Sequence, residues 1–148
     1  MNNTWFVIVN PTSGNGASKK KWPLIFKELT NQKIVFDFEI TKHKNHAIDI
    51  VETAIKKGYT HFICVGGDGT LHTIVNGILS LNPSNLNDIK LGIIPIGTGN
   101  DWVKTYNIPL DFKKAIEIIK EQNTVSQDIG KIEILNTGKI VYFNNLAG

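Results

Sequence analysis

The chain has 148 residues, enough for one ordinary domain with a hydrophobic core. Hydrophobic residues make up 41% and charged residues 20%, which excludes a disordered chain, and no apolar run is long enough to span a membrane. The net charge is only +3 and all sixteen basic residues are lysines, which argues against nucleic-acid binding. One cysteine and no secretory signal predict a cytoplasmic protein.

The first predicted strand is the apolar run Trp5–Val9, and a glycine-containing loop, Asn10–Gly16, follows it directly. A helix is expected at about 18–30. Its inner face is expected to consist of Leu24, Ile25 and Leu29. Lys19–Lys21 are more typical of a solvated helix start than of a phosphate-binding patch.

A second strand is predicted at Ile34–Ile40, with Thr41–Asn45 as its exit loop. The next helix is expected at about 46–57, where apolar residues recur on one side and Gly58 follows as a C-terminal glycine. The four histidines lack the spacing of a zinc site, so we expect them to be ordinary surface or loop residues.

A phosphate-binding arrangement is predicted in the middle of the chain. Phe62–Val65 reads as a strand buried on both faces, and glycines at 66, 67 and 69 permit a tight turn after it. A helix is expected from Leu71 with Thr70 as its N-cap. Because free N–H groups and the positive end of the helix dipole meet there, the turn suits a phosphate.

Asp68 stands inside this turn. A carboxylate beside a polyphosphate repels it unless it holds a metal ion, takes a proton from a nucleophile or accepts a hydrogen bond from a sugar hydroxyl. The alternative is a turn aspartate that bonds its own backbone. Glycines on both sides, directly after a buried strand, favour the functional interpretation.

A third glycine-rich turn, Ile96–Asp101, follows the predicted strand Lys90–Pro95. Asp111 caps a further helix, and the strands Val125–Leu135 and Lys139–Asn145 form a hairpin. The helix is expected to bury Phe112, Ala115, Ile116 and Ile119.

The alternation of strands and helices predicts a three-layer, Rossmann-like α/β fold, with a parallel sheet covered by helices on both faces. The carboxyl ends of parallel strands lie at one edge of the sheet, where such folds bind ligands. The loops Asn10–Gly16, Gly66–Thr70 and Gly97–Asp101 are therefore expected to converge on one cleft.

Three ordered motifs resemble the diacylglycerol kinase catalytic domain family, which includes bacterial lipid kinases and sphingosine kinases and is distantly related to NAD kinases. The motifs are Asn10-Pro11-Thr12-Ser13-Gly14, Gly66-Gly67-Asp68-Gly69-Thr70 with Asn76-Gly77, and Pro95-Ile96-Gly97-Thr98-Gly99-Asn100-Asp101. The resemblance runs from about residue 4 to the end of the chain. It implies ATP-dependent phosphorylation of a lipid hydroxyl, such as that of diacylglycerol, during peripheral contact with a membrane.

The resemblance also implies site residues. Asp68 would be catalytic, with the principal general base in a further domain, and Mg²⁺ would be held through water by Asp68, Asp101 and Asp128. The implied nucleotide-binding residues are Asn10, Pro11, Thr12, Ser13, Gly14, Thr41, Gly66, Gly67, Asp68, Gly69, Thr70, Leu71, His72, Thr73, Thr98 and Asn100.

The chain departs from the family in three ways. Thr73 stands where members usually carry glutamate, and Lys104 replaces an arginine. Members also continue into a β-rich domain with the lipid pocket, so we expect residues 1–130 to be the ATP-binding N-terminal domain and 131–148 the start of a truncated β-sandwich. Such a fragment is expected to fold but to turn over lipid poorly, and its last strand leaves a homodimer open.

Two alternatives stay open. An NAD kinase-like enzyme shares the Gly-Gly-Asp-Gly-Thr turn, although the other two motifs favour the lipid branch. A non-catalytic nucleotide-binding regulatory protein would keep the fold without the chemistry, and Thr73 favours it.

Overall fold

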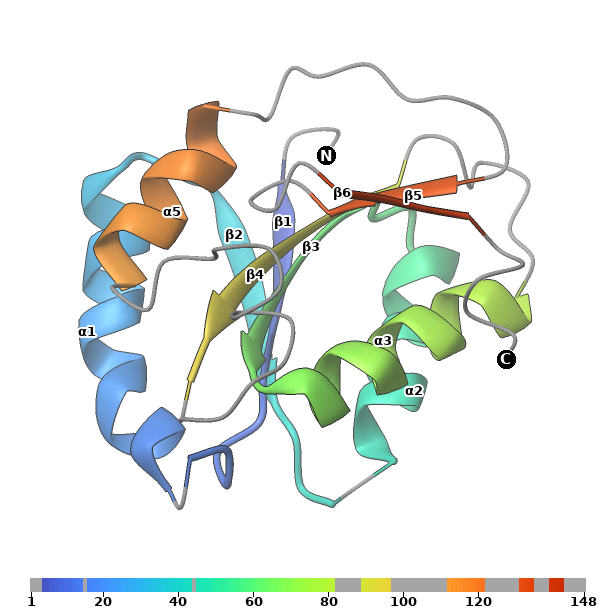
Figure 1. Cartoon of the computed structure of the whole chain (residues 1–148), viewed down its shortest axis with the longest axis horizontal. Coiled ribbons are helices and arrows are strands. Elements are labelled where there is room, and N and C mark those ends of the chain that lie inside the picture. Colours follow the sequence, from blue (N-terminus) through green and yellow to red (C-terminus); the bar gives the residue numbers. More distant parts are fainter. Residues whose placement is uncertain are drawn as a thin grey trace.

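The computed structural model describes residues 4–14, 16–43, 45–81, 89–96, 112–121, 131–134 and 139–142. Its elements are β1 (Trp5–Val9), α1 (Ala17–Asn31), β2 (Phe36–Ile40), α2 (His46–Lys56), β3 (His61–Gly66), α3 (Asp68–Leu81), β4 (Lys90–Pro95), α5 (Phe112–Glu121), β5 (Lys131–Ile134) and β6 (Lys139–Tyr142). They build one sheet in the order β2-β1-β3-β4-β5-β6 (Figure 1). All neighbouring strands are parallel except β5 and β6.

The sheet has a separate apolar core on each face. Helices α2 and α3 cover one face and α1 and α5 cover the other (Figure 1). Successive strand residues alternate between them, so that Phe62 and Cys64 belong to the first core and Ile63 and Val65 to the second. The expected Rossmann-like α/β fold, with a parallel sheet between two helical layers, is confirmed.

The inner face of α1 differs from the expected one at Leu24. This side chain is 56% exposed, whereas Ile25 and Leu29 are fully buried as expected. Counting back in helical steps from Ile25 leads to Trp22 and Ser18, which are the other buried residues of α1. The assignment of Leu24 to the inner face was therefore wrong, and Trp22 takes its place there.

The start of α3 also differs from the prediction. The helix begins at Asp68, and its first turn is closed by the Leu71 N–H bond to the Gly67 carbonyl (3.1 Å). Thr70 is the third residue of the helix and is therefore not its N-cap; its hydroxyl instead accepts a hydrogen bond from Asn10 in the loop after β1. The glycine expected to end α2 is confirmed, since Gly58 has φ +100°.

The C-terminal strands extend the same sheet. β5 pairs with β4 through Lys90–Glu133 and Leu91–Ile134. β6 then runs antiparallel to β5, as expected of a hairpin. The division of the chain at residue 130 into two domains stays a prediction.

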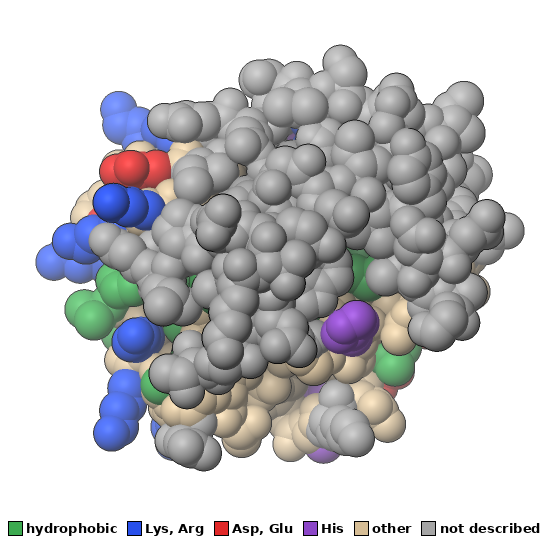
Figure 2. Space-filling view, viewed as in Figure 1, with side chains coloured by type: hydrophobic (Ala, Val, Ile, Leu, Met, Phe, Trp, Pro, Cys, Tyr) green, Lys and Arg blue, Asp and Glu red, His purple; other side chains and the backbone are tan. Residues whose placement is uncertain are grey.

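The lysines at the start of α1 are exposed, as expected of a solvated helix start. Figure 2 shows lysine side chains along the side of the molecule where Figure 1 places α1. Within the described part of the chain, no helix is long and apolar enough to cross a membrane.

Candidate functional site

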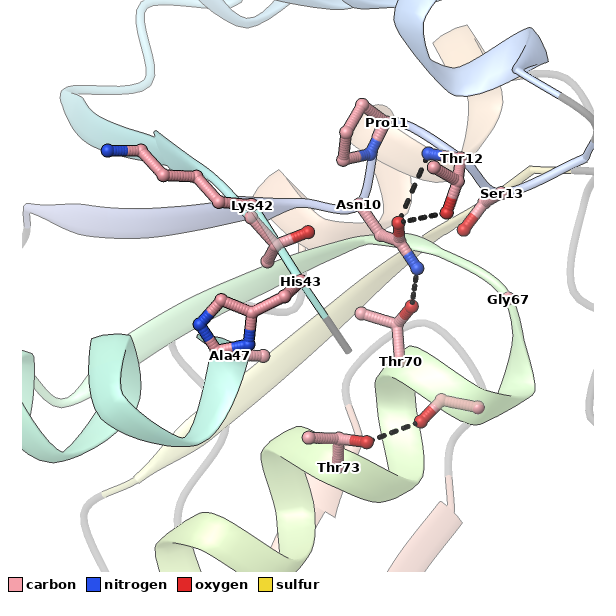
Figure 3. Close-up of a pocket in the computed structure, with 12 residues that line it drawn as sticks. Asn10, Pro11, Thr12, Ser13, Lys42, His43, Ala47, Gly67, Thr70 and Thr73 are labelled. Atoms are coloured by element: carbon pink, nitrogen blue, oxygen red, sulfur yellow. Dashed lines mark hydrogen bonds between the residues drawn. The ribbon is translucent and has the colours of Figure 1, made fainter. Parts of the chain in front are cut away.

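A cavity of about 430 Å³ opens at the carboxyl ends of β1, β2 and β3 (Figure 3). β1 lies between β2 and β3, so the chain passes from β1 to one neighbour and then returns to the other side. This reversal is the position at which open α/β sheets bind ligands. The cavity is lined by Asn10, Pro11, Thr12, Ser13, Thr41, Lys42, His43, Ala47, Gly67, Gly69, Thr70 and Thr73.

Asn10 connects the loop after β1 to the start of α3. Its Nδ2 amide donates to Thr70 Oγ1 at 2.8 Å, across 60 positions of sequence (Figure 3). Its Oδ1 accepts from the Thr12 backbone N–H (3.1 Å) and from the Thr12 hydroxyl (2.9 Å). The backbone N–H of Asn10 donates to the Val65 carbonyl at 3.0 Å. One side chain therefore holds two of the three predicted motifs in register.

Gly66 allows these loops to approach closely. A Cβ added there would lie 2.9 Å from Thr70 Oγ1 and 3.1 Å from Ser13 Oγ. Both distances are shorter than ordinary carbon–oxygen contacts, so a side chain at this position would displace the two hydroxyls. The glycine is required by packing between the loops, behind the cavity and not on its lining.

The amino end of α3 supplies donors to the cavity. Because the first intrahelical bond comes from Leu71, the N–H groups of Asp68, Gly69 and Thr70 precede the ladder of helical hydrogen bonds. Gly67 and Gly69 line the cavity, and apart from the adjoining residues and the helix backbone no described atom lies within 4 Å of a Cβ added at Gly69. An anion can therefore reach the backbone at a point that the helix dipole favours.

The loop after β2 forms another wall. The Thr41 N–H donates to the Val9 carbonyl at 2.8 Å, which fixes the loop against β1, and Thr41 is 9% exposed. Lys42, His43 and Ala47 continue this wall. Sequence reasoning missed these three residues, although they follow a strand that ends at the same edge.

The structure gathers nine of the predicted nucleotide-binding residues on the cavity, whereas four others lie off it. Gly14 is in the turn that leads into α1 and has φ +63°. Leu71 is 2% exposed in the core, and His72 is exposed on α3. Gly66 lies behind the loops and not on the lining. The nucleotide-binding roles of all these residues stay predictions. The side chain of Asp68 is not described. The other predicted site residues, Thr98, Asn100, Asp101 and Asp128, lie outside the described residues.

The residues around the amino end of α3 bear on the predicted magnesium site. Among the described residues, no group of three His, Cys, Asp or Glu side chains could hold a metal ion. Magnesium beside polyphosphates is typically held by one or two carboxylates together with phosphate oxygens and water. Asp68, as the first residue of α3 between two glycines of the cavity lining, has the chemistry and position that this arrangement needs.

A second cavity, of about 600 Å³, lies between β2 and α2. Its lining includes the carboxylates Asp37, Glu39 and Asp49. The Tyr59 hydroxyl donates to the Asp37 carboxylate, and this hydrogen bond raises the pKa of Tyr59 above its ordinary value. Carboxylates repel a polyphosphate, so this larger cavity is the less suitable of the two for a nucleotide.

Comparisons with known proteins identify the same family as the sequence motifs. The diacylglycerol kinase catalytic domain family matches residues 4–132. A diacylglycerol kinase of Staphylococcus haemolyticus is 36% identical over 141 residues, which are 95% of this chain and 40% of that protein. The corresponding protein of Staphylococcus carnosus is 34% identical, over 95% of this chain and 43% of its own.

A solved structure described as a diacylglycerol kinase from Bacillus anthracis has a TM-score of 0.66 and 27% sequence identity. The similarity covers 80% of this chain and 42% of that one. The chain thus spans less than half the length of each of these relatives.

Proposed function

Since this chain belongs to the diacylglycerol kinase catalytic domain family, we propose that it is the ATP-binding domain of a lipid kinase. The kinase transfers the γ-phosphate of ATP to a free hydroxyl of a lipid of the diacylglycerol class, during peripheral contact with a membrane. The observation that carries this proposal is the Asn10–Thr70 hydrogen bond, which closes two motif loops around a cavity at the amino end of α3.

The described residues suit the first requirement of phosphoryl transfer, which is positioning of the phosphates. The backbone N–H groups of Asp68, Gly69 and Thr70 bind phosphate oxygens, and Asn10 keeps their loop in place. Thr12 and Ser13 approach from the opposite loop (Figure 3). Thr41 and its neighbours contact the part of the nucleotide that extends away from α3.

The acidic residues complete the proposal. Asp68, with Asp101 and Asp128, would hold Mg²⁺ through water, and the ion would neutralise charge on the phosphates. The general base that accepts the proton of the lipid hydroxyl would come from a further domain, which also chooses the lipid. By this proposal the 148-residue chain binds ATP but transfers phosphate slowly or not at all.

A non-catalytic nucleotide-binding protein is the second candidate, and Thr73 is the observation that favours it. The Thr73 hydroxyl donates to the Gly69 carbonyl of its own helix at 2.9 Å, so its donor is engaged within α3. A threonine used in this way does not replace the longer carboxylate that the resemblance leads us to expect at this position. A full-length protein that binds ATP and phosphorylates neither diacylglycerol nor NAD would support this candidate.

The test is ATP binding by calorimetry, with and without Mg²⁺, for the wild type and Asp68→Asn. We expect Mg²⁺ to strengthen ATP binding to the wild type and Asp68→Asn to abolish that gain, a loss of at least about tenfold or ~1.4 kcal/mol. Asp49→Asn is the matched control, because Asp49 is an exposed carboxylate in the first turn of another helix. An ATP affinity that changes neither with Mg²⁺ nor with the Asp68→Asn substitution would contradict the kinase proposal.

A further inference from the structure

Thr41, Lys42 and His43 form the part of the wall at which the chain leaves the sheet. Contacts other than the strand hydrogen bonds must therefore hold this part of the wall in place. Within the described part of this loop, the Thr41 N–H makes the last bond to β1. Beyond it, the His43 carbonyl accepts from the His46 N–H (3.2 Å) at the start of α2. All three wall residues therefore lie in the loop between the end of β2 and the beginning of α2.

His46 contacts this wall at two points and β2 at a third. Its Nδ1 accepts a hydrogen bond from the backbone N–H of Lys42 at 3.0 Å. Its ring stacks on that of His43, with centroids 5.1 Å apart and an interplanar angle of 27°. Its Nε2 lies 3.4 Å from a carboxylate oxygen of Glu39, the fourth residue of β2. The side chain of His46 is 17% exposed, so these contacts are partly shielded from water.

We infer that His46 is a positioning residue for the nucleotide, although it does not line the cavity itself. It fixes the backbone of Lys42 by a hydrogen bond and the ring of His43 by stacking, while Glu39 orients its own ring. Nδ1 can accept from Lys42 only if it carries no proton, so the hydrogen must be on Nε2, where it faces Glu39. The inference rests on the proposed function, because it assigns the wall to an ATP site.

The wall and the amino end of α3 are different parts of the cavity lining, so loss of the wall should affect the two ends of a bound ATP differently. Phosphate binding by the Gly67–Thr70 backbone needs no contact with His46. ATP, which also contacts the wall, should bind more weakly when His46 is removed. Inorganic tripolyphosphate should bind as before. A general loss of folding would weaken both ligands equally, so the comparison separates positioning from stability.

The variants separate the two ring nitrogens. His46→Asn keeps an acceptor close to the position of Nδ1, whereas His46→Gln places its amide near the position of Nε2. We expect His46→Ala and His46→Gln to weaken ATP binding by about tenfold, and His46→Asn by threefold or less. Thr53→Ala, at an exposed position of α2, is the control and should bind ATP like the wild type.

The wild-type chain provides a readout that does not depend on ATP. Nitrogen-15 NMR of the His46 ring should show the Nε2–H tautomer, because Nδ1 accepts from Lys42. The Lys42 amide should shift in His46→Gln but little in His46→Asn. The Nδ1–H tautomer, or equal ATP and tripolyphosphate losses in His46→Ala, would overturn the inference. If the wild type bound no ATP, the proposed function would fail, while the NMR result would still decide whether His46 holds the wall.

Discussion

The glycines at positions 66, 69 and 77 form a matched set that tests how the cavity is built. All three lie in or beside α3, and each can be replaced by alanine with the same chemical change, one added methyl group. The structure gives this methyl group different surroundings in each case. The three variants should therefore separate loop packing, ligand approach and helix propensity.

At Gly66 the added Cβ would lie 2.9 Å from Thr70 Oγ1 and 3.1 Å from Ser13 Oγ. Overpacking of this kind costs about 1–3 kcal/mol, and loss of the Asn10–Thr70 hydrogen bond adds about 1 kcal/mol. The expected loss in free energy of unfolding for Gly66→Ala is thus about 2–4 kcal/mol. ATP binding should weaken as well, because the two loops separate.

At Gly69 no described atom lies within 4 Å of the added Cβ, and at Gly77 the nearest is the Ile48 Cα at 3.6 Å, an ordinary contact. The free energy of unfolding of both variants should be unchanged or higher by up to about 1 kcal/mol, because alanine has a higher helix propensity than glycine. Only Gly69 lines the cavity, so Gly69→Ala should weaken ATP binding by about tenfold, and Gly77→Ala should bind like the wild type.

Urea unfolding and ATP calorimetry on the same preparations measure both quantities. Unchanged m-values would show that the variants unfold from comparable states. The reasoning would be refuted if Gly66→Ala were as stable as the wild type. It would also be refuted if Gly69→Ala bound ATP normally, because the phosphates would then not approach the backbone at this point.

Three further predictions concern the fold around the site. In a double-mutant cycle of Asn10→Ala and Thr70→Val, the free energies of unfolding should show a coupling of about 1 kcal/mol, and strict additivity would exclude a stabilising hydrogen bond between them. Ile25→Ala should cost about 2–5 kcal/mol in urea unfolding while Leu24→Ala costs no more than about 0.5 kcal/mol, and equal losses would contradict the packing of α1. Burial, and then the nearby Lys90 charge, lower the pKa of His61 below its ordinary value of 6.5. The unfolded chain therefore takes up this proton first, so stability should fall as pH drops through 6.5, and His61→Gln should flatten that dependence.

The sequence predicted most of the fold because its periodicities are local. β1 and β4 begin and end at the predicted residues, since each is a buried apolar run bounded by a loop. The meeting of the loops after β1 and β3 at one sheet edge followed from parallel strands alone, whereas the third predicted loop lies outside the described residues. Leu24 was misassigned because it is apolar and adjacent to Ile25, and the sequence alone did not show which of the two faces the core. Trp22 was not recognised as part of the inner face.

The site was less predictable because it depends on contacts between distant segments. The Thr70 hydroxyl fits the pattern of an N-cap, and only the position of Asn10, 60 residues earlier, shows that it accepts a bond from another loop. Lys42, His43 and Ala47 enter the cavity because β2 lies next to β1 in the sheet. The sequence order of the strands does not specify this neighbour.

The central claim is that ATP binds at the amino end of α3, between the loops that Asn10 joins. The most direct measurement is a map of backbone amide NMR shifts during titration of the wild-type chain with Mg²⁺ and ATP. We predict the largest changes at the amides of Thr12, Ser13, Gly67, Gly69 and Thr70. Changes confined to the acidic cavity between β2 and α2, or no changes at saturating ATP, would contradict the account.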